Sequence, residues 1–379
     1  MTYVSSDGAF GGPVAVADTQ TRELARRGHD VHLLAGWDGI AHLEIPDVNV
    51  KLFPASGPSS LGFSGLLSPA LIRYLRVNAS TYDVVHVHAG RHAISLLAAR
   101  AADKADIPFV LQTHGMVMPD NRIKSRLFDS LGLRRLMTRA ASVLALTAAE
   151  ASGLAAVAPI NDRVQRIRNG IESAPRFARP DASEGRPEVL FLARLHPRKR
   201  VMAFAKMALL MTQAGVDAEF NVIGPDEGDR SALKSFIKEH KLTNLKYEGT
   251  IAPGTAQERL SRADVFVLPS TGEVFPMTVL EAISVRTPTV LTSDCGISAE
   301  LEEQGAALVT DGTPAELARA VSALFTDVTV RSDLELGMGR AMSETFGISA
   351  VAERLEEIYQ SAIAMAGSDT KFQPRTDVA

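Results

Sequence analysis

The chain contains 379 residues, with a formal charge of −4, a hydrophobic fraction of 46% and a single cysteine. This length exceeds what one hydrophobic core usually holds and predicts two domains of ordinary size. The composition is that of a globular protein, and the small negative charge gives no reason to expect nucleic-acid binding.

Three features of the chain bear on its location. Cys295 has no second cysteine with which to form an internal disulfide, which favours a reducing compartment. Residues 1–12 lack the basic start and the apolar stretch of a signal peptide. No run approaches the roughly 18 apolar residues that a membrane span needs. We therefore expect a cytoplasmic protein, whose contact with a membrane would be peripheral and on the inner face.

Short apolar runs rich in Val, Leu and Phe alternate with helical patterns along most of the chain. In the first half the predicted strands are Val31–Ala35, Val84–His88, Phe109–Thr113, Val143–Leu146 and Val164–Ile167. In the second half they are Val189–Ala193, Phe220–Gly224, Val265–Pro269, Thr289–Thr292 and Ala307–Val309. Runs without strict alternation are typical of strands buried on both faces of a parallel sheet. The pattern predicts an α/β fold of doubly wound, Rossmann-like domains.

Helix signals agree with this alternation. Gly28 is placed to end a helix over Val14–Arg27, since glycine favours the position after a helix. Thr313 and Glu316 form a capping-box pattern, with Pro314 at the first helical position.

The segment 173–187, SAPRFARPDASEGRP, has the composition of a linker, with three prolines and no apolar periodicity. It predicts a boundary between a first domain of residues 1–178 and a second domain of residues 179–348. A last helix is expected over residues 349–366. The polar residues 367–379 are expected to form a disordered tail.

A dense basic segment, RLHPRKR, follows the predicted strand Val189–Ala193 and precedes a helix. Its certain cations are Arg194, Arg198, Lys199 and Arg200. Cations are unfavourable at the positive end of a helix dipole unless an anion lies among them. In open α/β sheets, ligands bind beyond the carboxyl ends of the strands, so a phosphate or diphosphate is the natural partner. A solvated basic loop is the alternative.

A second candidate element, STGEVFPMTVLEA, follows the predicted strand Val265–Pro269. Pro276 suits the first turn of a helix, which places Glu273 in the loop and Glu281 on the helix. Both carboxylates can face the same crevice as the basic segment, and carboxylates are good acceptors for sugar hydroxyls. Taken singly, each acid could equally be a surface or helix-capping residue.

Arg194-x4-Lys199, followed by Glu273-x7-Glu281, resembles the donor-site signature of glycosyltransferase family 4, the retaining enzymes of glycosyl transferases group 1. The resemblance implies a GT-B fold, in which two Rossmann-like domains face each other across a cleft. The second domain would bind the nucleotide sugar and the first the acceptor. The last helix, 349–366, would return to the first domain.

The resemblance also implies residue roles. Arg194 and Lys199 would neutralise the donor diphosphate as it leaves, Glu273 would contact the sugar and Glu281 the ribose. The intervening Phe275 and Pro276 are counted with the donor site. Two family glycines are replaced, by Ala193 and Arg286. A left-handed conformation at Arg286 would cost roughly 1 kcal/mol.

The first half contributes three weaker candidates. Gly11 and Gly12 open the first predicted helix, where backbone N–H groups can approach a ligand closely; a plain tight turn is the alternative. His114 follows the strand Phe109–Thr113 and, by resemblance, contacts the transferred sugar. His86 and His88 alternate on one face of a strand, and a structural or pocket-lining role is favoured over a metal pair.

Residues 121–139 form a basic segment with apolar residues at helical spacing. Ile123, Leu127 and Leu131 recur every fourth position among six basic residues, with Asp129 as the one acid. Such a segment can lie on an anionic membrane surface. The alternative, which the pattern favours, is an ordinary helix that turns its apolar side to the core.

The predicted function is a retaining glycosyltransferase that moves a hexosyl unit from a UDP- or GDP-sugar to a glycan or lipid-linked acceptor. By resemblance, the acceptor belongs to envelope or exopolysaccharide synthesis. No Asp-x-Asp pair occurs, so Arg194 and Lys199 are expected to replace a metal, and no cofactor is expected. A GT-B nucleotide-sugar epimerase and a non-catalytic nucleotide-sugar-binding partner are the alternatives.

Overall fold

The computed structural model describes residues 3–5, 11–58, 64–172, 185–252 and 254–369. The chain divides into two compact units. The first contains Met1–Gly170 and Ile348–Ala379, and the second contains Ile171–Gly347. The boundary that we predicted after residue 178 falls within residues 173–184, which lie outside the described residues. None of the helices in the described ranges is long and apolar enough to cross a membrane.

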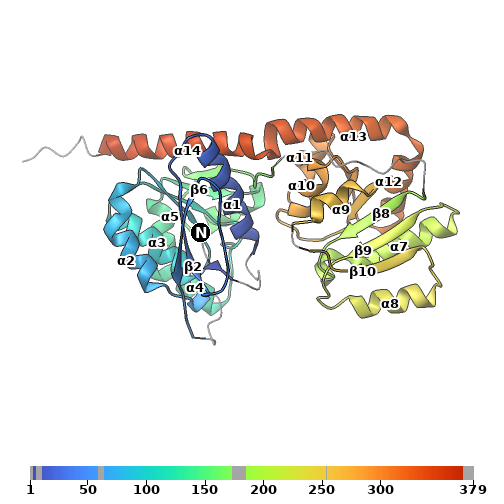
Figure 1. The fold of residues 1–379 in the computed structure, drawn as a ribbon, viewed down its shortest axis with the longest axis horizontal. Coiled ribbons are helices and arrows are strands. Elements are labelled where there is room, and N and C mark those ends of the chain that lie inside the picture. Colours follow the sequence, from blue (N-terminus) through green and yellow to red (C-terminus); the bar gives the residue numbers. More distant parts are fainter. Residues whose placement is uncertain (1–2, 6–10, 59–63, 173–184, 253, 370–379) are drawn as a thin grey trace, which may run out of the picture. The chain divides into compact units, whose positions relative to one another are not determined.

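The first unit contains two parallel sheets (Figure 1). One has the order β1-β2-β3 and the other β4-β5-β6-β7. The strands are β1 (Tyr3–Val4), β2 (His32–Trp37), β3 (Asn49–Pro54), β4 (Val85–His88), β5 (Phe109–Gln112), β6 (Ser142–Ala145) and β7 (Val164–Arg166). The sequence predicted β2 and β4 to β7. It missed β1, which has two residues, and β3, which has no buried residue.

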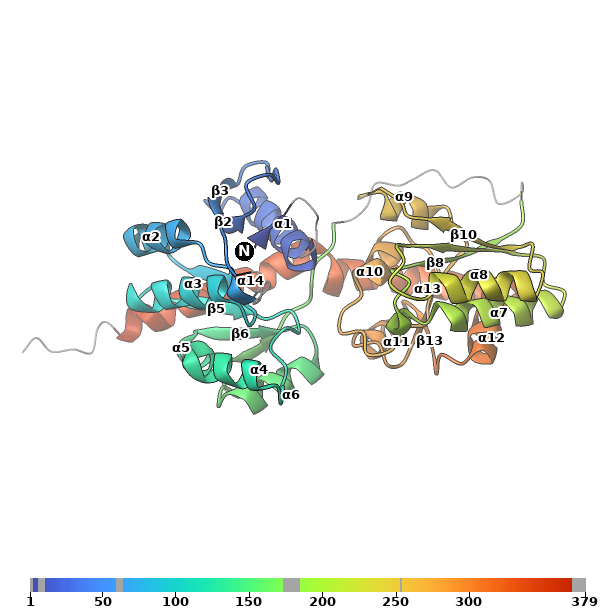
Figure 2. The ribbon, with the colours of Figure 1, turned by 90° about the horizontal axis from the view of Figure 1, so that it is seen from below.

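Helices cover both faces of the sheet β4 to β7. One face packs with α3, α5 and α6, and the other with α1 and α14. Figure 2 shows α5 and α6 on one side of β5 and β6, and α1 and α14 on the other. The helices of this unit are α1 (Gly11–Arg26), α2 (Pro69–Asn78), α3 (Ala93–Lys104), α4 (Ile123–Phe128), α5 (Arg134–Arg139), α6 (Ala148–Val157) and α14 (Ile348–Asp369). A short 3-10 turn (Ala79–Thr81) follows α2, and the π-helical turn η3 (Asp129–Leu133) joins α4 to α5.

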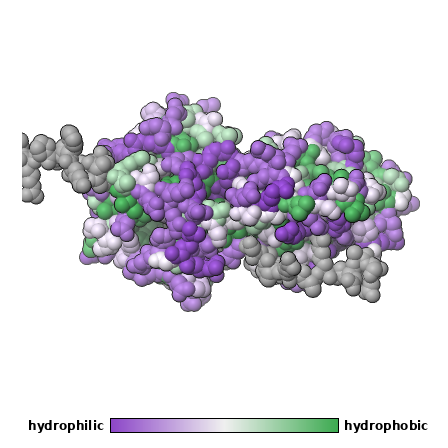
Figure 3. All heavy atoms as spheres, turned by 90° about the horizontal axis from the view of Figure 1, so that it is seen from above, coloured by the Kyte–Doolittle hydropathy of each residue, from purple (hydrophilic) through white to green (hydrophobic). Residues whose placement is uncertain are grey.

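The last helix, α14, belongs to the first unit although its residues come at the end of the chain. Its buried residues Val351 and Leu355 share a core with Val110 of β5 and Leu144 of β6. Hydrophilic side chains predominate on the face of this unit along which α14 runs (Figure 3). The helix extends to Asp369, beyond the predicted end at residue 366, and residues 370–379 lie outside the described residues.

The second unit is built on one parallel sheet with the order β10-β9-β8-β11-β12-β13. The strands are β8 (Glu188–Leu192), β9 (Glu219–Ile223), β10 (Leu245–Gly249), β11 (Val265–Leu268), β12 (Thr289–Thr292) and β13 (Leu308–Thr310). Every residue of β11 and β12 is buried, which explains their continuous apolar sequences. β10 was missed because exposed residues alternate along it with one buried and two half-buried residues. The strand order reverses between β8 and β11, which is where such sheets bind ligands.

Helices flank this sheet in the second unit. They are α7 (Val201–Gln213), α8 (Arg230–Glu239), α9 (Ala256–Ser261), α10 (Met277–Ser284), α11 (Ser298–Glu303), α12 (Pro314–Thr326) and α13 (Val328–Ala341). The short turns η4 (Pro197–Lys199) and η5 (Met342–Phe346) precede α7 and follow α13. One half of the predicted capping box of α12 is confirmed, because the Thr313 hydroxyl accepts from the backbone N–H of Glu316 at 3.3 Å. The other half was wrong, because the Thr313 N–H donates to Asp311 Oδ1 at 2.8 Å and not to the Glu316 side chain.

Candidate active site

The basic segment after β8 uses its four cations in two ways. Arg198 donates from Nη2 to the carbonyl of Gly272, and Arg200 donates from Nη2 to the carbonyl of Gly312 at 2.9 Å. These two guanidinium groups therefore brace neighbouring loops. We expected all four cations to surround a bound anion. Because Arg198 and Arg200 donate to backbone carbonyls, only Arg194 and Lys199 remain as candidates to bind it.

Lys199 and Glu273 form an ion pair between the basic segment and the loop after β11. Lys199 Nζ lies 2.5 Å from Glu273 Oε2, and the two side chains are 16% and 18% exposed. The Glu273 carbonyl also accepts from the N–H of Gly296 at 2.7 Å, which ties this loop to the segment after β12. The last residue of the Arg194-x4-Lys199 motif is thus joined to the first residue of the Glu273-x7-Glu281 motif. The two side chains follow the carboxyl ends of the neighbouring strands β8 and β11.

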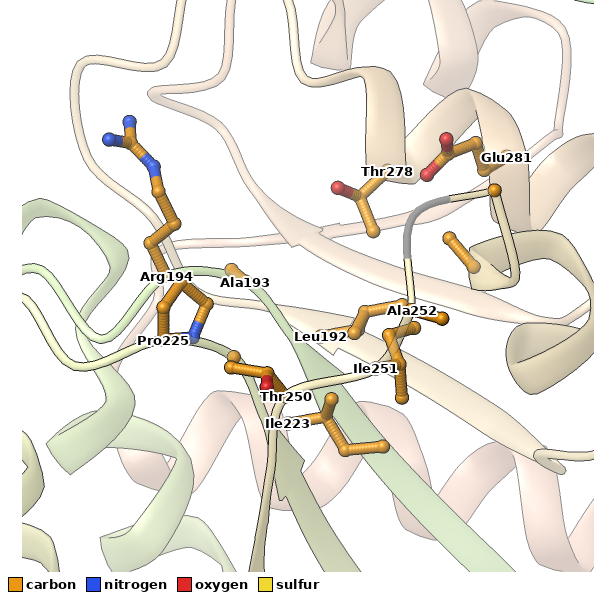
Figure 4. Close-up of a pocket in the computed structure, with 13 residues that line it drawn as sticks. Leu192, Ala193, Arg194, Ile223, Pro225, Thr250, Ile251, Ala252, Thr278 and Glu281 are labelled. Atoms are coloured by element: carbon orange, nitrogen blue, oxygen red, sulfur yellow. The ribbon is translucent and has the colours of Figure 1, made fainter. Parts of the chain in front are cut away.

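A pocket of about 310 Å³ opens at the carboxyl ends of β8 and β9. Figure 4 shows Arg194 and Glu281 on opposite sides of it, with Ile223 and Ile251 among the apolar residues between them. Gly224 forms part of the lining with φ 149°, and a Cβ there would lie 1.8 Å from the carbonyl oxygen of Ala193. This position therefore requires glycine, since the strand end and the loop approach too closely for a side chain.

Glu281 brings a carboxylate into the pocket from the second turn of α10. Burial raises its pKa above the ordinary value for a glutamate. Within the described ranges its carboxylate has no hydrogen-bond partner, so its oxygens are available to a ligand that offers hydroxyl groups.

Arg194 is held by an acid that the sequence analysis missed. Its Nη1 lies 2.8 and 3.1 Å from the two carboxylate oxygens of Glu227, and the Arg194 side chain is 62% exposed. Glu227 lies in the loop after β9, in the run GPDEGD. The signal that could have identified it is an acid at the carboxyl end of the strand next to β8, where a parallel sheet gathers its loops.

Phe275 and Pro276, which the sequence analysis counted with the donor site, have structural roles here. Phe275 is buried and packs against Phe346, with ring centroids 6.3 Å apart. Pro276 is the residue that precedes α10, in an extended conformation. Neither lines the pocket, and their contact with a donor stays a prediction.

The candidates of the first half lie in the first unit. His114 follows β5 with φ 51°, its Nε2 lies 2.8 Å from Nδ1 of His88, and the two rings are stacked. Burial lowers the pKa of His114 to about 3 and that of His88 well below its ordinary value, so both rings are neutral. Gly11 and Gly12 are the first two residues of α1, as predicted.

A buried carboxylate, which the sequence analysis missed, fixes the loop that carries His114. Glu150 Oε1 accepts from the Thr113 hydroxyl and from the N–H of Gly115, each at 2.5 Å. Its Oε2 accepts from the N–H of Leu146 at 2.7 Å. A carboxylate with three donors is well compensated for its burial, so this network holds the His114 loop in one conformation.

The histidines do not assemble into a metal site with other ligands. In the part of the chain that the structure describes, no group of three or more His, Cys, Asp or Glu side chains is arranged to hold a metal ion. His86 instead meets the Tyr359 hydroxyl of α14 through Nδ1 at 2.6 Å.

Two family profiles match the two halves of the chain. The profile "Glycosyltransferase Family 4" matches residues 10–174, and "Glycosyl transferases group 1" matches residues 186–327. The chain belongs to glycosyltransferase family 4. The family predicted from the sequence is thereby confirmed, and the protein is an enzyme that transfers a glycosyl group.

Known proteins resemble the chain over most of its length. A D-inositol 3-phosphate glycosyltransferase from Paenarthrobacter aurescens (strain TC1) is 28% identical over 311 residues, which are 75% of this chain and 74% of the relative. The crystal structure of HepE from Anabaena in complex with UDP and glucose superposes with a TM-score of 0.70 at 19% identity, covering 95% of this chain and 98% of that one. A glycosyltransferase from Rickettsia africae ESF-5 superposes with a TM-score of 0.73 at 14% identity, covering 96% and 97%. The GT-B fold predicted from the sequence is confirmed.

Proposed function

We propose that this glycosyltransferase moves a hexosyl unit from a UDP- or GDP-sugar to a glycan or lipid-linked acceptor, without a metal ion and with retention of the anomeric configuration. The observation that carries the proposal is the pocket of the second unit, which Arg194 and Glu281 flank from opposite sides. One side offers a cation for a diphosphate and the other a partly buried carboxylate for ribose hydroxyls.

Among the candidate nucleotides, we favour a uridine diphosphate. HepE from Anabaena, which has the same fold, was crystallised with UDP and glucose. The apolar residues Ile223 and Ile251 offer a surface against which a flat base can pack, and the neighbouring backbone offers hydrogen-bonding groups.

For the reaction, we propose attack of an acceptor hydroxyl on the anomeric carbon from the face on which the diphosphate leaves. The new bond joins the acceptor oxygen to the anomeric carbon, the bond from that carbon to the diphosphate oxygen breaks, and the leaving diphosphate takes the hydroxyl proton. Lys199 and Arg194 stabilise the charge that grows on the diphosphate, and such charge stabilisation is often the largest contribution to catalysis. His114, whose ring is neutral, would hydrogen-bond the transferred sugar rather than carry charge.

The proposal also includes a class of acceptor. A glycan or lipid-linked acceptor of envelope or exopolysaccharide synthesis is the proposal, with the enzyme on the cytoplasmic face of the membrane. A phosphorylated polyol is the second candidate, because the curated relative is named for D-inositol 3-phosphate.

Thermal unfolding with a panel of nucleotides tests the donor site. A ligand that binds only the folded protein raises the melting temperature. We expect a rise with UDP and one UDP-sugar, unchanged by a chelator. A chelator-sensitive rise would contradict metal independence, and no rise with UDP, GDP or any of their sugars would contradict the donor site. An NMR assignment of the anomeric configuration in the product then tests retention. Conversion of the donor to its epimer without an acceptor would favour the epimerase alternative.

A further inference from the structure

The segment from Ile123 to Leu133 turns an apolar stripe towards solvent. Ile123, Leu127 and Leu131 are 84%, 55% and 67% exposed. They are spaced by four residues along α4 and η3, a spacing that places side chains on one side of a helical segment. The sequence analysis favoured a helix that packs its apolar positions into the core. That expectation was wrong for these three residues, and the core is contacted instead by Leu133, Leu136 and Met137.

Exposed arginines lie next to this stripe in the sequence. Arg126, Arg134 and Arg135 are exposed, and none forms an ion pair or side-chain hydrogen bond within the residues that the structure describes. Arg122 and Arg139 differ, because they pair with Asp120 and Asp103. The exposed stripe therefore lies next in sequence to positive charge that has no acidic partner among the described residues.

The one acid of the segment is withdrawn from this surface. Asp129 is 4% exposed, and its two carboxylate oxygens accept from Nε and Nη2 of Arg91 at 2.9 and 3.0 Å. Arg91 also donates to the carbonyl of Met118 at 2.8 Å, which anchors the segment to the body of the unit. This buried pair holds η3 so that its acid faces inwards and Leu131 faces outwards.

We propose that Ile123, Leu127 and Leu131, with Arg126, Arg134 and Arg135, form a docking surface for an anionic lipid bilayer. We call these six residues the lipid-docking face. Apolar side chains enter the boundary between headgroups and acyl chains, and arginines attract anionic headgroups. The charge argues for this partner, because no acid on the face would repel an anionic surface. The helix is short, so apolar insertion and charge are both needed for stable binding.

The lipid-docking face goes beyond the proposed function, since donor binding takes place in the second unit. It would bring a membrane-bound acceptor to the first unit. Transfer to a water-soluble acceptor does not depend on it, so the failure of one proposal leaves the other intact.

Co-sedimentation of the full-length protein with vesicles tests this inference. We expect binding to vesicles that contain phosphatidylglycerol at low salt, at least tenfold weaker binding to phosphatidylcholine vesicles, and loss of binding at high salt. The variant Leu127→Ser/Leu131→Ser should reduce binding at least tenfold. The variant Arg126→Gln/Arg134→Gln/Arg135→Gln should reduce it further, since each arginine near an anionic surface changes partitioning roughly fivefold.

Matched controls separate this face from general surface effects. Val77→Ser in α2 and Leu336→Ser in α13 remove exposed apolar side chains elsewhere, 71% and 64% exposed, and should leave vesicle binding unchanged. All variants should keep the wild-type melting temperature and the wild-type shift with UDP. Absence of binding to anionic vesicles at low salt would overturn the inference. The inference would also be overturned if the double serine variant and the triple glutamine variant both bound vesicles as tightly as the wild type. A third contradicting result is a dimer, detected by light scattering, that depends on the apolar stripe and does not bind vesicles.

Discussion

Lys199 and Glu273 are joined by an ion pair with 2.5 Å between Nζ and Oε2, although they follow different strands, β8 and β11. The two strands are neighbours in the sheet, and the pair lies where the strand order reverses. In the absence of a donor, Glu273 compensates the positive charge of Lys199, which we propose interacts with the donor diphosphate during the reaction. Donor binding would then offer Lys199 a second anion, and the ammonium group is placed in advance of the reaction.

Replacing Lys199 with alanine should lower turnover by one or more orders of magnitude, because the variant loses a positive charge that stabilises the leaving diphosphate. The measurement is kcat with saturating donor. Lys206→Ala removes an exposed lysine from α7 and is the matched control. A Lys199→Ala enzyme with wild-type turnover would exclude the proposed role.

Replacing Glu281 with glutamine should raise the KM for the donor more than it lowers kcat, because the lost interaction holds the ribose both before and during the reaction. Isothermal titration with UDP gives the same comparison without turnover, and we expect affinity to fall roughly tenfold, as for a lost hydrogen bond to a charged group. Glu303→Gln in α11 changes an exposed acid of the same unit and serves as control. An effect confined to kcat would overturn this division.

Arg194 and Arg200 lie in one segment, but we expect their replacement to have different effects. One replacement should lower stability and the other should weaken UDP binding. Arg200→Ala removes hydrogen bonds to the carbonyls of Gly312 and Pro269, so the free energy of unfolding should fall by about 1.5–3 kcal/mol. Arg194→Ala removes a mostly exposed side chain and should weaken UDP binding with little change in stability. Thermal unfolding with and without UDP measures both quantities. The opposite pattern would mean that the roles of the two arginines are reversed.

The buried histidines predict how stability depends on pH. Burial lowers the pKa of His92 to about 3, whereas an unfolded histidine titrates near 6.5. Between these values the unfolded chain binds a proton that the folded chain does not. The free energy of unfolding should therefore fall as pH decreases from about 6.5, by about 1.4 kcal/mol per pH unit for this residue.

His92→Asn tests that dependence while keeping the helix cap. The Nδ1 of His92 accepts from the N–H of Ser95 at the start of α3, and asparagine is a good residue at this position. At pH 8 the variant should resemble the wild type in chemical denaturation. At pH 5 its stability should have fallen less. Parallel pH profiles for the two proteins would show that His92 does not contribute.

Much of the fold could be predicted from local sequence. β11 and β12 are continuous apolar runs because helices cover both faces of a parallel sheet, and burial on both faces leaves a direct mark on composition. β3 and β10 have no continuous apolar run. The side chains of β3 are half-buried or exposed, and exposed side chains alternate with less exposed ones along β10. The return of α14 to the first unit was expected only through the family resemblance, since no local pattern states which core a helix joins.

The sequence by itself determined that cations follow β8, that two acids follow β11 and that residues 121–139 form a basic segment with a helical apolar pattern. Only the tertiary structure decided that Arg198 and Arg200 brace loops, that Glu227 holds Arg194 and that Ile123, Leu127 and Leu131 face solvent. The physical reason is the same in each case. The spacing of residues defines which side chains share a face, but hydrogen-bond partners and burial come from segments that are distant in the chain.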